Sequence, residues 1–296
     1  MVEVIKLGHV GLVAKNYDAM LHYYKEILGL KLMAETTGAS YFRVGVEHHA
    51  VALYKGDEAG LHHVAFQVDP KYSAAEVAKA LSEKGIPAQV EHDTDPWIPE
   101  VVSFRDLDGT RVELYGEVPL PSSVENLTAI APLKLGHVAR GVADVRSTCS
   151  YYETQLGFRV SDWMEDFFVF LRCSPDHHSV NFIKAPAHNL HHVAFQVSDW
   201  SHIQRSSDIL ATHGIPLTWG PVRHGIGHNI SIYHLNPDGS RVELFCEMDL
   251  MLDERLGYFE PRPWHEDNPQ RPKVWKGTSR TRNIWGIGPP EAHRNA

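Results

Sequence analysis

An internal repeat constrains the fold of this chain more than any other feature of its sequence. Three segments of the first half recur in the second half: Leu7–Val10 (LGHV) at Leu135–Val138, Leu61–Val68 (LHHVAFQV) at Leu190–Val197, and Asp108–Leu114 (DGTRVEL) at Asp238–Leu244 (DGSRVEL). The copies of His9, His63 and Glu113 follow them by 128, 129 and 130 residues. Such near-constant offsets indicate that one domain has been duplicated in tandem.

Each half also divides into two similar units. A strand that carries a histidine is followed by an amphipathic helix and then by short strands, and the same order starts again. The helices are expected at about residues 17–28, 73–84, 145–155 and 201–213. Ser73 can cap the second of these, with Glu76 three residues later completing a capping box. The chain therefore has the pattern of an α+β protein, with four βαβββ modules in two tandem homologous domains.

Composition shifts suggest the domain boundaries. We expect an N-terminal domain at residues 1–117 and a C-terminal domain at residues 133–250. We expect a linker at residues 118–132, because this segment contains Pro119, Pro121 and two following serines. From about residue 251 the periodicity fades, and residues 251–296 form a tail rich in proline and tryptophan. We expect this tail to be irregular and to lie against the surface or a neighbouring subunit.

Charge and composition exclude several classes of function. The formal net charge of −9 argues against a nucleic-acid partner, which needs a basic face. No apolar stretch approaches the ~20 residues that span a membrane, and no signal peptide is apparent at the start. The three cysteines form no disulfide framework, so a cytoplasmic protein is expected. Twenty histidines are the one compositional oddity, and they point toward metal or proton chemistry.

The stretch from Arg223 to Glu243 combines a strand–turn–strand pattern with a carboxylate inside the second strand. Residues 230–235 have the composition of a strand, residues 236–239 (NPDG) that of a turn, and residues 241–245 that of a returning strand. Glu243 lies between Val242 and Leu244, so its carboxylate is on the face opposite to theirs. An unpaired carboxylate facing the core would be very costly. Glu243 therefore either faces solvent or meets something positive.

These modules, together with His137, His192 and Glu243, resemble the vicinal oxygen chelate superfamily. More narrowly, the chain resembles type I extradiol ring-cleaving dioxygenases, the relatives of catechol 2,3-dioxygenase and 2,3-dihydroxybiphenyl dioxygenase. The resemblance covers about residues 5–250. Its most specific part runs from Arg223 to Glu243, where family-like spacing is kept by His224, Tyr233, Asn236, Pro237, Gly239 and Glu243.

The resemblance implies a metal site made of His137, His192 and Glu243. Two neutral imidazoles and one carboxylate form the facial triad that suits non-haem Fe(II) and leaves coordination positions open. Mn(II) is an alternative ion, because the same ligands accept it. Strand alternation sends His191 to the face opposite His192, which leaves His191 a structural role or a role beside the ligands.

The resemblance also implies three catalytic residues. His178 lies fourteen residues before His192, at the position of the family's acid–base histidine, with His177 as the alternative. His224 and Tyr233 match residues that hydrogen-bond the oxygen and the catecholate, and His228 and Asn229 are expected to support them. Trp219 faces either the substrate pocket or the core. In the pocket it would favour an uncharged aromatic substituent on the substrate.

The implied function is extradiol cleavage of a catechol-type aromatic diol in aromatic catabolism. Both atoms of O2 would enter a 2-hydroxymuconic semialdehyde-type product, without an organic cofactor. The family also suggests a homo-oligomer, for which a tetramer is one arrangement. Two alternatives remain on the same scaffold: a glyoxalase-like isomerase that uses Zn(II) or Ni(II), and a metal-free module that binds small molecules.

The first half retains part of this pattern. His9, His63 and Glu113 occupy the repeat positions of the three ligands, and His49 lies fourteen residues before His63. The counterpart of Tyr233 is Ser103, and the run RHGIGHN is replaced by roughly DTDPWIP, which has no equivalent of His224. We therefore expect catalysis in the C-terminal domain and a structural copy in the N-terminal domain. Whether that copy binds metal stays open at this level.

Overall fold

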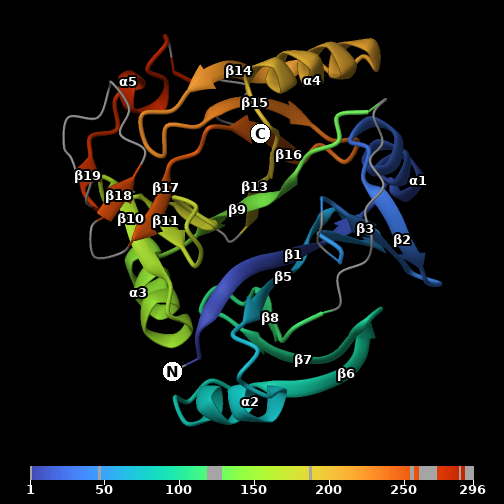
Figure 1. Cartoon of the computed structure of the whole chain (residues 1–296), viewed down its shortest axis with the longest axis vertical. Coiled ribbons are helices and arrows are strands. Elements are labelled where there is room, and N and C mark those ends of the chain that lie inside the picture. The colour runs from blue at the N-terminus through green and yellow to red at the C-terminus, as the bar shows by residue number, and fades with distance from the viewer. Residues whose placement is uncertain are drawn as a thin grey trace.

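The computed structural model describes residues 2–45, 48–118, 129–186, 189–253, 257–259, 272–286 and 288–290. Each half of the chain folds into one curled sheet with helices on its outer side (Figure 1). The strand order is β2-β3-β4-β1-β5-β8-β7-β6 in the first sheet and β14-β15-β16-β13-β9-β12-β11-β10-β19 in the second. The prediction of an α+β chain with four βαβββ modules is confirmed.

The element bounds follow the repeat. The first half contains β1 (Val4–Ala14), α1 (Tyr17–His22), the π-helical turn η1 (Tyr23–Ile27), β2 (Lys31–Glu35), β3 (Ala39–Arg43), β4 (Val51–Lys55), β5 (Gly60–Val68), α2 (Ala74–Ser82), β6 (Gln89–Asp95), β7 (Ile98–Arg105) and β8 (Arg111–Tyr115). The second half contains β9 (Lys134–Val142), α3 (Val145–Leu156), β10 (Arg159–Met164), β11 (Phe168–Arg172), β12 (Val180–Lys184), β13 (Asn189–Gln196), α4 (Trp200–Thr212), β14 (Leu217–Arg223), β15 (Ile230–Leu235) and β16 (Arg241–Cys246).

Local sequence explains where the second helix begins, whereas the first helix continues in an unexpected form. Ser73 accepts a hydrogen bond from the backbone of Glu76, whose side chain returns to Ser73, so the predicted capping box is present. The first predicted helix forms, but it changes to a π-helical turn after His22. In that turn Tyr23 and Tyr24, although adjacent, are both fully buried. None of the described helices has the length and apolar character needed to cross a membrane.

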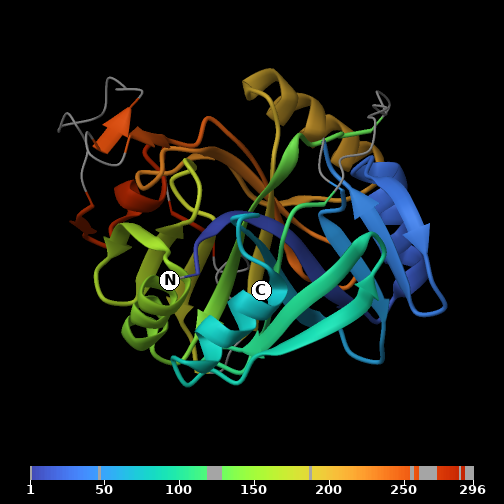
Figure 2. The same cartoon turned by 60° about the horizontal axis from the view of Figure 1, so that its bottom comes forward.

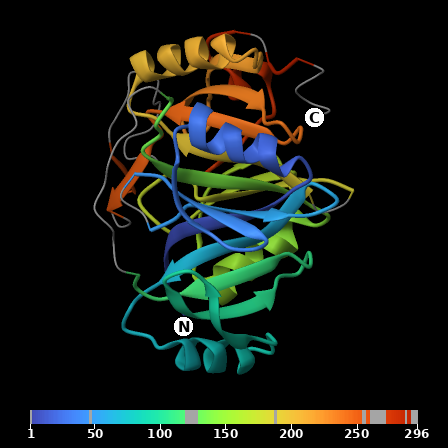
Figure 3. The same ribbon diagram turned by 90° about the vertical axis from the view of Figure 1, so that its right-hand side faces the viewer.

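The two halves share one apolar core. Buried residues of both sheets form a single cluster, in which the rings of Phe66 and Phe158 meet edge to face at 5.2 Å. The first module also contacts the fourth, where Tyr23 Oη lies 2.6 Å from His234 Nε2. Figure 3 shows α1 beside the strands of the fourth module, and Figure 2 shows α2 in front of the second module. The halves thus form one folded unit.

Part of the predicted tail is regular. The described elements are β17 (Leu250–Asp253), β18 (Gly257–Phe259), β19 (Val274–Trp275) and α5 (Ser279–Arg282). β19 adds to the edge of the second sheet by pairing in parallel with β10, Trp163 opposite Val274. Residues 119–128 of the predicted linker, and tail residues 260–271, lie outside the described part of the chain.

A buried ion pair joins the halves and gives a stability prediction. Arg140 Nη1 donates to Asp106 Oδ2 at 2.7 Å, and the hydroxyl of Tyr152 donates to the same oxygen at 2.9 Å. Asp106→Ala leaves the Arg140 charge buried without its partner, so we expect unfolding free energy to fall by about 3–5 kcal/mol. Chemical denaturation measures this. The control Glu58→Ala breaks an exposed pair with Lys15 and should cost at most about 1 kcal/mol. Equal effects of the two changes would contradict the expectation.

Candidate metal centre and active-site cavity

One row of paired residues runs across the second sheet and builds the site. Trp219 on β14 pairs with Tyr233 on β15, and Tyr233 pairs with Glu243 on β16. Glu243 and His137 both pair with Ala194 on the central strand β13. Directly paired residues project from the same face of a sheet. The duplicated strands therefore bring side chains that are far apart in sequence to one surface.

His192 joins this row by strand alternation. It precedes Ala194 by two positions on β13, so its side chain is on the face that carries His137 and Glu243. His137 Nε2 lies 3.0 Å from His192 Nε2, and Glu243 Oε2 lies 3.1 Å from each of these nitrogens. All three residues are at least 95% buried. The structure thus brings together the three residues that the sequence assigned to a metal.

The spacing of these atoms fits three ligands on one face of an octahedron. At metal–ligand distances of about 2.1 Å, ligands at right angles lie about 3.0 Å apart, whereas tetrahedral ligands lie about 3.4 Å apart. The observed 3.0–3.1 Å separations match the first arrangement. Two imidazoles and one carboxylate in that arrangement suit Fe(II) or Mn(II) and leave the opposite positions open.

Outer hydrogen bonds orient these side chains. Asn229 Nδ2 and Ser231 Oγ donate to Glu243 Oε1 at 2.9 and 2.6 Å, which leaves Oε2 directed at the two histidines. His191 lines the cavity as well, and its Nδ1 lies 2.7 Å from His192 Nδ1, so it does lie beside the ligands. The expectation that it faces the opposite side is wrong, because the register of β13 against β9 shifts between Leu190 and His192. When His192 donates this hydrogen bond, its Nε2 keeps the lone pair that a metal needs.

The electrostatics favour the metal-binding protonation states. Burial lowers the pKa of His192 to about 4, so its imidazole is neutral at pH 7. Burial alone would raise the pKa of Glu243, but the attraction of His137 and hydrogen bonds from both histidines hold it well below its usual range. A neutral imidazole beside an ionised carboxylate is the donor set that divalent metals require.

Removing one of the orienting groups should weaken metal binding. We expect Ser231→Ala to raise the dissociation constant for Mn(II) about 10- to 100-fold, because Glu243 Oε1 loses its shortest hydrogen bond. Titration of the metal-free protein followed by calorimetry measures the change. Ser240→Ala, in the turn before β16, serves as the matched control and should bind Mn(II) like the unaltered chain. An unchanged affinity in Ser231→Ala would show that the carboxylate needs no such support.

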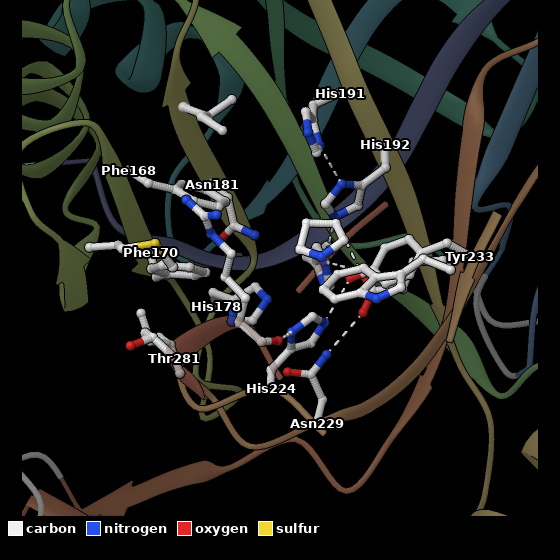
Figure 4. Close-up of a pocket in the computed structure, with 18 of the residues that line it drawn as sticks. Phe168, Phe170, His178, Asn181, His191, His192, His224, Asn229, Tyr233 and Thr281 are labelled. Atoms are coloured by element: carbon white, nitrogen blue, oxygen red, sulfur yellow. Dashed lines mark hydrogen bonds and ion pairs between the residues drawn. The ribbon is translucent and has the colours of Figure 1, made fainter. Parts of the chain in front are cut away.

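A cavity of about 230 Å³ opens over the three residues. Figure 4 shows His192 and Tyr233 on one side of it, His224 and Asn229 below, and Phe168 and Phe170 on the opposite side. His137 and Glu243 also line it. Its remaining walls are mostly apolar, made of Met164, Phe167, Ile183, Trp219, Ile226 and Pro289 together with the polar Asn181, Thr281 and Arg282. The volume lies just below the roughly 300–1,000 Å³ of ordinary ligand pockets, which favours a small ligand.

His178 lines the cavity, and its ring lies 4.3 Å from that of His137. His177, the alternative, is directed elsewhere: its Nε2 lies 3.0 Å from Asp162 Oδ2, and its Nδ1 lies 2.9 Å from His178 Nδ1. Because a carboxylate only accepts, His177 donates to Asp162 and then accepts from His178 Nδ1. This chain leaves Nε2 of a neutral His178 free to accept a proton.

His224 and Tyr233 form a second pair at the cavity. His224 Nδ1 donates to the carbonyl of Arg282 at 2.8 Å, and His224 Nε2 lies 2.8 Å from Tyr233 Oη. Burial lowers the pKa of His224, so the neutral ring accepts the tyrosine hydroxyl at Nε2. Burial and the nearby Glu243 raise the pKa of Tyr233 well above its usual range. Tyr233 therefore keeps its proton, which it donates to His224 Nε2 at the cavity wall.

The structure also settles the positions that the sequence left open. Trp219 lines the cavity and stacks on Tyr233 at 5.4 Å. Asn229 holds Glu243, whereas His228 bonds to Asp249 and is not among the cavity-lining residues. Sequence reasoning missed Ser231, although alternation from Tyr233 places it on the ligand face. It also missed that the tail supplies part of the cavity wall, since no motif marks those positions.

The same row recurs in the first sheet with different residues. Glu113 and His9 both pair with Ala65, and Glu113 also pairs with Ser103, which confirms that Ser103 is the counterpart of Tyr233. Gln89, which pairs with Ser103, occupies the position of Trp219. At these two positions the first half therefore has neither the indole nor the phenol of the second half. It has instead an acidic residue, Asp95, within 4.8 Å of the histidine and glutamate ligand atoms.

Comparison with known proteins agrees with this architecture. The model of the Glyoxalase/Bleomycin resistance protein/Dioxygenase superfamily matches residues 6–114 and 134–244. A manganese-dependent 2,3-dihydroxybiphenyl 1,2-dioxygenase from Geobacillus genomosp. 3 is 26% identical, over 93% of this chain and 94% of the relative. A metapyrocatechase from Pseudomonas sp. (strain CF600) is 26% identical, over 83% of this chain and 87% of the relative.

Solved structures share the fold over nearly the whole chain. A Mn(II)-bound glyoxalase from Novosphingobium aromaticivorans superposes with a TM-score of 0.86 at 25% identity, covering 99% of this chain and 94% of that one. The 2,3-dioxygenase LapB from Pseudomonas sp. KL28 superposes with a TM-score of 0.80 at 24% identity, covering 93% and 98%. At these identities the likeness to LapB speaks for the fold alone.

Proposed function

Because the chain belongs to the Glyoxalase/Bleomycin resistance protein/Dioxygenase superfamily, we propose that it is an extradiol dioxygenase that opens catechol-type aromatic diols with O2. The observation that carries this proposal is the facial group His137, His192 and Glu243 at the base of a cavity that also holds His178 and the His224–Tyr233 pair. The relatives named as a 2,3-dihydroxybiphenyl dioxygenase and a metapyrocatechase support it over most of their length.

We propose that the three residues hold Fe(II), with Mn(II) as the alternative. A bound ion would supply open positions at which diol and O2 meet, and would pass electron density from one to the other. The protein contributes the ligand charge: two neutral imidazoles and one carboxylate leave a divalent site with a net positive charge. That charge favours the deprotonated diol over the neutral one.

The cavity residues supply proton transfer and hydrogen-bond donors. His178, neutral because burial lowers its pKa, accepts a proton from the diol at Nε2 and returns it to an oxygen during ring opening. Tyr233 keeps its hydroxyl proton and can turn it from His224 Nε2 toward developing negative charge once the diol is bound. His224 positions that hydroxyl, since its own orientation is held by the Arg282 carbonyl. The product is a 2-hydroxymuconic semialdehyde-type acid.

The walls favour a small diol with an apolar substituent. Phe168 and Phe170 stack with ring centroids 4.5 Å apart, and Trp219 and Ile226 extend the apolar lining. Arg282 is the one cationic side chain among the lining residues. Catechol and alkylcatechols should therefore be turned over with higher kcat/KM than a catechol with a carboxylate substituent. A higher kcat/KM for the catechol with a carboxylate would indicate that Arg282 binds this substituent.

The test uses colour and oxygen uptake. The protein is loaded anaerobically with Fe(II), mixed with catechol, 3-methylcatechol or 2,3-dihydroxybiphenyl, and exposed to air. A yellow product with one O2 consumed per diol supports extradiol cleavage. Loaded protein that gives neither colour nor uptake with any diol of the panel would contradict the proposal.

The second candidate is a glyoxalase-like isomerase using Zn(II) or Ni(II), and the similarity to the Mn(II)-bound glyoxalase favours it. An isomerase consumes no oxygen and does not need the His224–Tyr233 pair. Oxygen uptake with a diol therefore separates the two. The third alternative, a metal-free binding module, is disfavoured because three converging ligand side chains would be kept buried without use.

We propose a cytoplasmic location and a homo-oligomeric assembly. The three cysteines, Cys149, Cys173 and Cys246, are free and buried, which agrees with a reducing, cytoplasmic compartment. A homo-oligomer, for which a tetramer is one arrangement, is tested by light scattering of the purified protein.

A further inference from the structure

The first half of the chain contains a second cluster of metal-ligand residues that the proposed reaction does not use. His9, His63, Asp95 and Glu113 each offer one ligand atom, and these atoms lie within 4.8 Å of one another. Their exposed fractions are 0, 1, 4 and 3%. Two buried carboxylates are costly unless positive charge compensates both, and one of these two, Glu113, forms an ion pair with Arg111. A positive occupant of the cluster would compensate the second.

Ligand-facing atoms of the cluster lack hydrogen-bond partners. Both ring nitrogens of His9, Nε2 of His63 and Oε2 of Glu113 are buried and form no hydrogen bond with the described residues. Buried polar atoms are nearly always satisfied, so several unsatisfied atoms converging on one point indicate an absent ligand. His9 Nε2 lies 3.4 Å from Asp95 Oδ2 and 4.0 Å from Glu113 Oε2, and His63 Nε2 lies 3.6 Å from Glu113 Oε2.

One further atom of each of Glu113, Asp95 and His63 is held from outside the cluster. Arg111 Nε donates to Glu113 Oε1 at 2.6 Å, Tyr54 Oη donates to Asp95 Oδ1 at 3.2 Å, and His62 Nδ1 lies 2.7 Å from His63 Nδ1. In each case the outer atom is bonded and the inner atom faces the cluster. Metal ligands are oriented by outer partners in this way.

Asp95 makes this cluster different from the one in the second half. It ends β6, pairs with Ile98, and is followed by the two-residue turn Pro96-Trp97, so the hairpin is as short as a hairpin can be. In the second half the corresponding loop runs over residues 224–229 and leaves room for the cavity. The short hairpin thus places a fourth ligand, Asp95, in the space that is open in the C-terminal half.

We propose that His9, His63, Asp95 and Glu113 form a closed, four-ligand site for a divalent ion of the Zn(II) class, with a structural role. Four protein ligands without an open position are typical of structural zinc sites, whose ligand atoms lie about 3.4 Å apart. Three of the separations are 3.4, 3.6 and 4.0 Å and all lie within 4.8 Å, so this cluster is wider than the second-half group with its 3.0–3.1 Å separations. None of the four residues lines the neighbouring cavity of about 130 Å³.

The two halves provide a matched pair of variants at one repeat position. Glu243→Gln disables the candidate catalytic site, and Glu113→Gln disables the proposed structural site. The full-length proteins are stripped with a chelator, reloaded with excess Zn(II), desalted and assayed for zinc per chain by mass spectrometry. We expect two equivalents in the unaltered chain, one in each single variant, and none in the double variant.

Two further readouts make the result independent of turnover. Zn(II) should raise the melting temperature of Glu243→Gln, and this rise should disappear when Asp95→Asn is added. Co(II) in Glu243→Gln should give the strong visible absorption of four-coordinate cobalt. Zinc absent from Glu243→Gln alone would overturn the proposal even if Glu113→Gln fails to fold. A retained equivalent that survives the change of both Glu113 and Asp95 would also overturn it.

Discussion

Glu243→Gln is expected to abolish ring cleavage and to remove one metal equivalent per chain. The change keeps the size of the side chain but removes the negative charge that faces His137 and His192 at 3.1 Å. Loss of a partner that only orients a metal ligand costs about 10- to 100-fold in affinity, so loss of the charged ligand itself should cost more than about 100-fold. Turnover is measured with catechol under saturating O2, and bound iron by mass spectrometry of the desalted protein.

The control for this prediction is the same change in the first half. Glu113 occupies the repeat position of Glu243, pairs with the same kind of alanine and is equally buried. Glu113→Gln should keep its turnover with catechol once Fe(II) is supplied. If both variants lost turnover equally while staying folded, catalysis would not belong to the C-terminal domain alone.

His178→Ala is expected to keep its iron and to lower kcat by about 10²- to 10⁴-fold. His178 lines the cavity, and its ring packs against that of His137 without joining the three ligand atoms. Burial and the neighbouring histidines lower its pKa well below the usual range, so a neutral ring is available at pH 7 to accept the proton of the diol. Removing it takes away proton transfer and leaves the metal ligands in place.

The matched control for this change is His49→Ala, at the corresponding repeat position, which should retain the kcat of the unaltered chain. Iron content and kcat are measured on the same preparations. Loss of iron from His178→Ala would place His178 among the ligands. An undiminished kcat with iron retained would remove it from proton transfer.

The fold was predictable because the repeat fixes strand register. Two copies of LHHVAFQV place His63 and His192 at the same point of a central strand, and the Asp-Gly turns place Glu113 and Glu243 beside them. Side chains of a strand alternate between its two faces. When one residue of a central strand pairs with a residue on each neighbouring strand, all three side chains therefore lie on the same face. The repeat thus shows which positions correspond in the two halves, whereas the assignment of His137, His192 and Glu243 as ligands came from the resemblance to extradiol dioxygenases.

Other parts of the site depend on contacts that carry no local signal. Arg282 and Thr281 belong to the tail and line the cavity. The tail is attached to the second sheet by the pairing of β19 with β10, and no periodicity in the sequence predicts this pairing. Asp95 becomes a potential ligand only because a two-residue turn shortens its hairpin. Tyr23, the first residue of the π-helical turn, likewise makes a contact with His234, far away in the chain. Tertiary contacts decide such features, and local sequence does not specify them.

The most direct test of the central claim follows the oxygen atoms. Fe(II)-loaded protein is mixed with catechol under 18O2 in unlabelled water, and the ring-opened product is trapped by reduction and analysed by mass spectrometry. The account predicts that the product carries both atoms of one O2 molecule. A product with no label, or a single labelled atom under conditions where exchange with water has been excluded, would contradict extradiol dioxygenation by this site.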